Sequence, residues 1–130
     1  MRLLLDSHSF VWAKAGGRAL SDDVLSAIAE AEKVFVSVAS AWELWIKHNK
    51  KPIARILDGG PSAFAAAANE SGIELLEMTL SHAAAAAALP LHHRDPFDRM
   101  IIAQALREGL TLVSRDRIFD RYAGLRILKI

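Results

Sequence analysis

The sequence predicts an α/β sandwich with a mostly parallel central sheet. Five short apolar runs, rich in Val, Ile, Leu and Phe, alternate along the chain with segments of helical periodicity. The runs lack the long apolar–polar alternation of a strand with one solvated face, and this is typical of buried parallel strands. Repeated alternation of strand and helix favours helices packed on the faces of one parallel sheet.

Each element has a local signal, and the expected strands are 2–5, 33–38, 73–77, 110–114 and 125–130. The expected helices are 8–15, 21–32, 39–50, 61–71, 81–88 and 96–108. Ser21 precedes an acidic first turn and is typical of an N-cap. Pro61 and Pro96 suit first-turn positions, and Gly72 and Gly109 suit helix ends.

Composition indicates one compact globular domain spanning 1–130, because 52% of the 130 residues are hydrophobic and 24% charged. The absence of cysteine excludes disulfides and thiolate metal sites and fits a reducing cytoplasm. No apolar run approaches the roughly 20 residues that span a bilayer, so no membrane association is expected. A net charge of +1 gives no global argument for a polyanionic partner. The basic stretch "KHNKKPIAR" is either a nucleic-acid patch or a solvated helix end.

Four acidic residues fall where parallel strands end or the following helices begin. Asp6 follows the first strand directly, and Asp116 lies two residues past the fourth. Glu43 and Asp98 lie in the first turns of expected helices. Ligands of open parallel sheets bind outside the carboxyl ends of the strands. We therefore expect the four side chains to point into one crevice.

The competing interpretation is that such acids only cap helices. Asp95 stands directly before Pro96, which makes it the natural N-cap of the helix over 96–108. Asp98 shares a helix face with Ile101 and Ile102, three and four residues onward, which is the face expected to pack on the sheet. Asp95 is therefore assigned to the cap and Asp98 to the crevice.

Carboxylates brought close together repel one another unless a cation neutralises them. Sites made only of oxygen ligands suit the hard cations Mg²⁺ and Mn²⁺. The five histidines form no H-E-x-x-H pair. His92 and His93 are interpreted as surface or satisfied core histidines rather than ligands.

Four segments in this order carry a family resemblance: "LLLDSHSFVWA", "VSVASAWELWIKHNKKP", "LPLHHRDPFDRMIIAQALREGLTLVSRD" and "LRILKI". The chain resembles the PIN-domain nucleases, and specifically the VapC-type toxins of bacterial toxin–antitoxin pairs. The resemblance implies a three-layer α/β/α sandwich and cleavage of RNA dependent on Mg²⁺ or Mn²⁺. It assigns catalysis and metal binding to Asp6, Glu43, Asp98 and Asp116.

The resemblance also implies a VapB-type antitoxin as partner, RNA as substrate and a homodimer. Ser114 falls where the family often has Ser or Thr beside the last acid, and Ser7 replaces a commoner Thr. The remaining candidates for substrate binding are Lys47, Arg99 and Arg115; the two arginines either steer phosphate or balance the acids. Whether Asp120 or Asp95 assists the site is left open by the sequence.

The aromatic residues Phe10, Trp12, Trp42 and Trp45 are interpreted as core residues. Part of this apolar surface is expected to bind the antitoxin.

Three rival functions fit the sequence less well. A phospho-acceptor receiver-like domain needs an acidic pair after the first strand and a Lys after a late strand, whereas Asp6 precedes Ser7 and His8 and the late strand ends "VSRD". A haloacid-dehalogenase-type phosphatase needs D-x-D, and "DSH" lacks it. A catalytically silent PIN-like module that binds RNA or protein is disfavoured by the complete acidic quartet.

Overall fold

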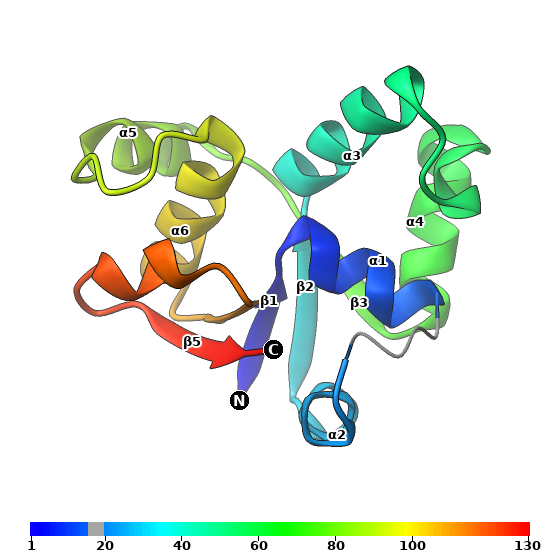
Figure 1. Ribbon diagram of the computed structural model, residues 1–130, viewed down its shortest axis with the longest axis horizontal. Helices are drawn as coiled ribbons and strands as arrows, with labels where there is room; N and C mark the ends of the chain where they lie inside the picture. The colour runs from blue at the N-terminus through cyan, green and yellow to red at the C-terminus, as the bar shows by residue number, and fades with distance from the viewer. Residues whose placement is uncertain (16–19) are drawn as a thin grey trace.

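The computed structural model describes residues 1–15 and 20–130, and its centre is a five-stranded parallel sheet (Figure 1). Every strand pair in it is parallel, and the order across the sheet is β3-β2-β1-β4-β5. The strands are β1 (Arg2–Leu5), β2 (Lys33–Ser37), β3 (Ile73–Leu76), β4 (Thr111–Ser114) and β5 (Arg126–Lys129). The parallel sheet predicted from the apolar runs is confirmed.

In the described residues, six α-helices connect and cover the strands. They are α1 (Ser7–Ala15), α2 (Asp22–Glu30), α3 (Val38–Lys50), α4 (Gly60–Glu70), α5 (Leu80–Ala88) and α6 (Pro96–Glu108). All expected strands and helices are present within two residues of their predicted bounds. Two short 3₁₀ helices, η1 (Arg55–Leu57) and η2 (Arg117–Arg121), were not expected, because elements of three to five residues show no periodicity.

The three central strands β1, β2 and β4 are buried on both faces, which explains why they are largely apolar. Leu3 and Leu5 of β1 belong to a core cluster shared with α1, α3 and α4. Leu4, pointing the other way, belongs to a second cluster with Ile101 and Ile102 of α6. Side chains of successive strand residues alternate between faces, so each face contributes its own core. The predicted three-layer α/β/α arrangement is confirmed.

The strand order reverses at β1, and this fixes where a site can form. After β1 the chain builds β2 and β3 on one side and later adds β4 and β5 on the other. Leu5 at the end of β1 is in register with Val36 of β2 and Val113 of β4. Parallel strands end at one edge, so the segments that follow these three strands meet there. This is the topological switch point at which such sheets bind ligands.

Within the described part of the chain, no helix is long and apolar enough to cross a bilayer.

The central position of β1 predicts a large difference between two leucine truncations. Leu4 is 0% exposed and Leu80, at the start of α5, is 89% exposed. We expect Leu4→Ala to lower the free energy of unfolding by about 2–5 kcal/mol, because it leaves a cavity between sheet and α6. Leu80→Ala should change it by less than about 0.5 kcal/mol. Urea denaturation of both variants measures this, and equal losses would contradict the packing described.

Candidate active site

Asp6 is fixed at the end of β1 by bonds to two neighbouring elements. Its backbone N–H donates to the Val113 carbonyl of β4 at 3.2 Å, which continues the sheet by one residue. Its carboxylate Oδ1 accepts from the Ser9 backbone N–H at 2.8 Å, in the first turn of α1. The Ser9 hydroxyl in turn donates to the Val113 carbonyl at 3.0 Å. Asp6 is therefore both the cap of α1 and a buried carboxylate at the switch point.

Glu43 projects from α3 and is tied to α1. Its Oε1 accepts a hydrogen bond from the Ser7 hydroxyl at 2.6 Å, between buried side chains. Its Oε2 lies 3.3 Å from the ammonium of Lys47, one helical turn onward. The Ser7 hydroxyl thus orients Glu43, one of the four predicted acids.

At the start of α6, Asp95 caps the helix and Asp98 does not, as predicted. Oδ1 of Asp95 accepts from the backbone N–H groups of Phe97, at 2.8 Å, and Asp98, at 3.2 Å, so Asp95 is the N-cap. The Asp98 side chain is thereby free of capping and lies beside the buried face that carries Ile101 and Ile102.

The pKa of the Asp98 carboxyl reflects both its burial and the acidic groups around it. The pKa of its carboxyl is raised from 3.8 to about 7, and burial is the largest cause. The negative charges of Asp95, Glu43 and Asp6 contribute to this rise, whereas His93 opposes it. Charges on α3 and after β1 act on Asp98 because all of them face the same space.

Asp116 follows β4 and caps η2. Its Oδ1 accepts from the Ile118 backbone N–H at 2.9 Å, and its own N–H donates to the Ser114 hydroxyl at 3.1 Å. Its other oxygen, Oδ2, lies 2.9 Å from Nε2 of His93. Ser114, a predicted substrate contact, is buried and shapes the turn that presents Asp116.

His93 is a residue of this site that sequence reasoning missed. It is a buried histidine, as one of the two interpretations allowed, but its Nε2 lies 3.1 Å from Oδ2 of Asp98 and 2.9 Å from Oδ2 of Asp116. The signal available was its place in "HHRDPFD", five residues before Asp98. Two adjacent histidines in a loop give no indication which of them turns inward, so the contact depends on the fold.

Arg99 makes contacts that favour a structural role. Its guanidinium donates to four backbone carbonyls, at distances from 2.8 to 3.3 Å. The acceptors belong to the end of α5 and the loop that follows it: Ala86, Leu89, Pro90 and His93. These bonds hold the α5–α6 connection and leave Arg99 a poor fit to a phosphate contact.

The other two predicted basic residues lie at the surface. The Arg115 guanidinium stacks 4.2 Å from the ring of Trp12, and Lys47 is half-exposed beside Glu43. Both therefore remain placed to meet an anionic ligand. Asp120 forms an ion pair with Lys129 of β5 and lies at the exposed surface.

The aromatic residues separate into core and rim. Phe10 is fully buried, and Trp45 packs on Phe64, so the core interpretation holds for them. It is wrong for Trp42, which is 56% exposed and packs edge-on against Phe97 with ring centroids 5.0 Å apart. These two rings join α3 to α6 beside Glu43 and Asp98, because each immediately precedes one of those acids.

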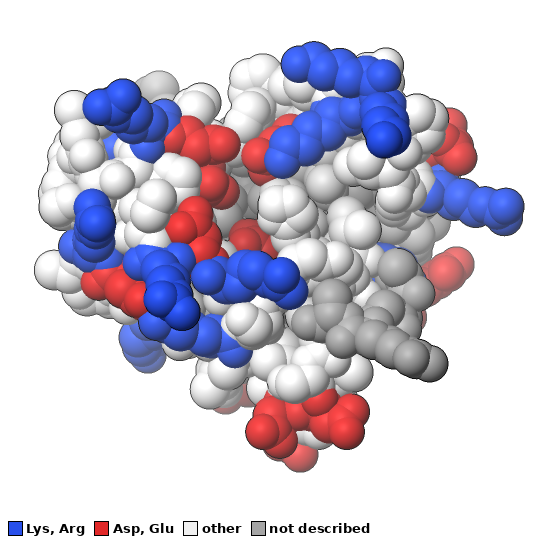
Figure 2. All heavy atoms as spheres, in the orientation of Figure 1, with Lys and Arg blue, Asp and Glu red and all other residues white. Residues whose placement is uncertain are grey.

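Figure 2 shows the collective result: Asp and Glu side chains gather in a hollow between the α3 side and the α6 side of this face, with Lys and Arg on both rims. Carboxylates this close together repel one another, and a bound cation would offset that repulsion. Their hard oxygen donors fit Mg²⁺ or Mn²⁺. His93, Asp98 and Asp116 each offer a ligand atom, and these atoms lie within 4.8 Å of one another. The residues present therefore fit a divalent metal site.

Comparison with known proteins places this arrangement in a family. The model of the PIN domain matches residues 3–125, almost the whole chain. The chain belongs to the PIN-domain family. A curated relative of this PIN domain, ribonuclease VapC22 of Mycobacterium tuberculosis, is 34% identical over 117 residues, which cover 88% of this chain and 87% of that protein. The predicted resemblance is confirmed at the level of the family.

Solved structures agree with the fold of the PIN domain. The structure of VapBC2 from Rickettsia felis bound to a promoter DNA fragment contains a chain that matches with a TM-score of 0.74 and 16% identity, covering 100% of this chain and 99% of that one. DNA-bound VapBC from Salmonella typhimurium matches with a TM-score of 0.71 and 18% identity, covering 99% and 98%. At these identities the likeness concerns the fold.

The raised pKa of Asp98 predicts an unusual pH dependence of stability. In the unfolded chain this carboxyl ionises near pH 4, whereas in the metal-free folded protein its pKa is about 7. The folded state binds this proton more tightly than the unfolded state does, so protonation of Asp98 stabilises the fold. This contribution to the free energy of unfolding is complete below about pH 4 and is lost as the pH rises through 7.

Melting temperatures measured in EDTA from pH 5 to 8.5 test this. Asp98→Asn should flatten the decline in stability with rising pH. Asp23→Asn, an exposed acid in α2, should leave the decline unchanged. A wild-type curve that rises through this range in parallel with Asp98→Asn would contradict the assignment.

Proposed function

We propose that this PIN domain, residues 1–130, is a metal-dependent endoribonuclease that hydrolyses phosphodiester bonds of RNA and serves as the toxin of a toxin–antitoxin pair. The observation that carries the proposal is the meeting of four carboxylates at the switch point of the sheet: Asp6, Glu43, Asp98 and Asp116. The similarity to ribonuclease VapC22 supports the reaction and the substrate class. RNA cleavage that arrests growth implies action in the cytoplasm.

The four acids would hold one or two Mg²⁺ or Mn²⁺ ions, with Asp6 and Asp98 as primary ligands and Asp116 and Glu43 completing the set. A bound ion supplies positive charge that stabilises the charge developing on phosphate and makes a water molecule more acidic. Ser7 orients Glu43, and the first turn of α1 orients Asp6, so both carboxylates are fixed before an ion binds. Proximity of a cation favours the ionised form of Asp98.

Around this centre we assign substrate contacts to side chains on the rim. Lys47 and Arg115 are exposed and basic, which suits the phosphates of RNA. Ser114 acts through the turn that presents Asp116. We assign Arg99 to holding the loop before α6, because its hydrogen bonds go to backbone carbonyls.

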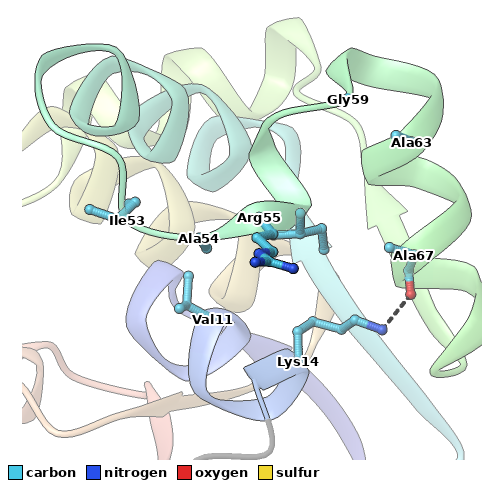
Figure 3. A pocket seen from close by; sticks show the side chains of 9 residues that line it. Val11, Lys14, Ile53, Ala54, Arg55, Gly59, Ala63 and Ala67 are labelled. Carbon is cyan, nitrogen blue, oxygen red and sulfur yellow. Dashed lines mark hydrogen bonds between the residues drawn. The ribbon is translucent and has the colours of Figure 1, made fainter.

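The partner we propose is a VapB-type antitoxin, since the two solved structures described above are VapBC assemblies. A pocket of about 620 Å³ offers a docking place for its apolar segment (Figure 3). The pocket lies between α1, the η1 segment and α4, and is lined by Val11, Ile53, Ala54, Ile56, Ala63 and Ala67 among others. Lys14 and Arg55 add positive charge at its wall, which suits an amphipathic segment carrying acidic residues. Homodimerisation stays an expectation from the resemblance.

Loss of a primary carboxylate should abolish cleavage. Purified protein freed of antitoxin should cut a labelled RNA pool with Mg²⁺ or Mn²⁺ and stop with EDTA. We expect Asp6→Asn and Asp98→Asn to slow single-turnover cleavage by at least about 100-fold, because several kcal/mol of charge stabilisation disappears. Asp120→Asn should retain the wild-type rate, since Asp120 is exposed and its carboxylate pairs with Lys129 of β5.

Each rival function has its own outcome in this experiment. RNA that binds without being cut by the wild-type protein would favour a silent binding module. Phosphate transfer from acetyl phosphate to Asp6 would favour a receiver-like domain. Cleavage that persists in both Asp→Asn variants would place the chemistry elsewhere.

The antitoxin pocket is tested by charge insertion. Ile53→Asp places a carboxylate on the apolar wall and should weaken binding of the antitoxin encoded beside this gene by at least about tenfold, equivalent to 1.4 kcal/mol. Leu91→Asp, in the loop before α6, should bind normally because that exposed residue lies outside the pocket. Isothermal titration calorimetry measures both, and RNA cleavage by Ile53→Asp should stay at the wild-type rate. Equal affinities would move the docking surface elsewhere.

A further inference from the structure

His93 is held in a fixed orientation by groups on three sides. Its ring packs against Phe119 with centroids 5.4 Å apart, and its backbone N–H donates to the Tyr122 hydroxyl at 2.9 Å. The Tyr122 hydroxyl donates in turn to the Pro90 carbonyl at 2.9 Å. Arg99 donates to the His93 carbonyl at 3.3 Å. The backbone of His93 is therefore anchored on two sides, and Phe119 packs against its ring.

The hydrogen bond on the other ring nitrogen determines where the imidazole proton lies. Nδ1 of His93 accepts from the backbone N–H of Asp95 at 3.2 Å. A backbone N–H only donates, so Nδ1 must present its lone pair. In a neutral imidazole the proton then resides on Nε2. That N–H is directed at Oδ2 of Asp98, 3.1 Å away, and Oδ2 of Asp116, 2.9 Å away.

His93 could act as a metal ligand or as a hydrogen-bond donor, and the distances alone allow both roles. The tautomer distinguishes them. His93, Asp98 and Asp116 lie close enough to share an ion. A protonated Nε2 has no lone pair for a metal, however. Ligation through Nε2 would require the proton on Nδ1, which would set two donors, Nδ1–H and the Asp95 N–H, against each other at 3.2 Å.

We propose that His93 is a positioning residue and not a metal ligand: its Nε2–H bridges the carboxylates of Asp98 and Asp116 and holds them in place for a divalent ion. The inference rests on the proposed metal-dependent function. Two carboxylates that face each other repel, and a shared donor offsets that repulsion while leaving their remaining lone pairs for the ion. Partners of this kind orient metal ligands in many sites.

The first test reads the tautomer directly. Nitrogen-15 chemical shifts of the imidazole, recorded by NMR on the full chain without metal and with Mg²⁺, distinguish protonated from unprotonated ring nitrogens. We expect an unprotonated Nδ1 and a protonated Nε2 for His93 in both states. A protonated Nδ1 in the presence of Mg²⁺ would overturn the proposal.

The second test compares metals. Calorimetric affinities for Mg²⁺ and Ni²⁺ are measured for wild type, His93→Ala and His93→Gln. Removing a positioning donor should weaken both metals by a similar factor, about 10–100-fold, and the amide N–H of Gln should restore part of it. A loss confined to Ni²⁺, which favours imidazole, would identify a ligand. Unchanged or tighter Mg²⁺ binding in His93→Ala would also overturn the proposal.

Neither measurement depends on RNA cleavage. A protein that binds Mg²⁺ with the expected tautomer yet cuts no RNA would refute the proposed function and leave the role of His93 standing.

Discussion

Repulsion among carboxylates at the end of β1 is the constraint around which the rest of this molecule is arranged. The sheet brings the segments after β1, β2 and β4 to one edge, and α6 adds its first turn. Three of the four acids are then fixed by a hydrogen bond: Asp6 to the start of α1, Glu43 to Ser7, and Asp116 to the start of η2. The pKa of Asp98 is raised to about 7, chiefly by burial and in addition by the charges of Asp95, Glu43 and Asp6. A divalent ion bound among these carboxylates would relieve the remaining repulsion.

Two of the four acids to which we assign the proposed chemistry also serve folding. Asp6 and Asp116 cap helical turns with one oxygen each, so only part of each carboxylate is committed to the backbone. Asparagine caps as well as aspartate does, because both offer a side-chain oxygen. An Asp→Asn exchange at these positions therefore removes charge while keeping the local fold, whereas alanine would disturb both. A substitution of Asp98 leaves the cap of α6 intact, since Asp95 performs the capping.

Strands and helices were predictable from sequence because each depends on local periodicity, and the positions of the four acids at strand ends or helix starts follow from those assignments. Asp95 and Asp98 were separable because helical spacing alone puts Asp98 on the inward face. The contacts of His93, Arg99 and Trp42 were not, because they join elements distant in the chain. His93 meets Asp116 across 23 residues, and Ser7 meets Glu43 across 36. No pattern within a helix or strand encodes contacts across such sequence separations. The first contact depends on η2 lying beside the loop before α6, and the second on α1 packing against α3.

The loop between α5 and α6 affects how a ligand can bind in this hollow. Arg99 of α6 and Tyr122, just past η2, fasten the loop through its carbonyls and the His93 amide. Loops with their backbone so engaged behave as extensions of the elements they join, because opening them would strand several polar groups at once. One wall of the hollow is thus a stiff template. A flexible polymer entering it must adjust its own backbone to that wall, so selectivity among sequences would be expressed as the ease with which each can bend to fit.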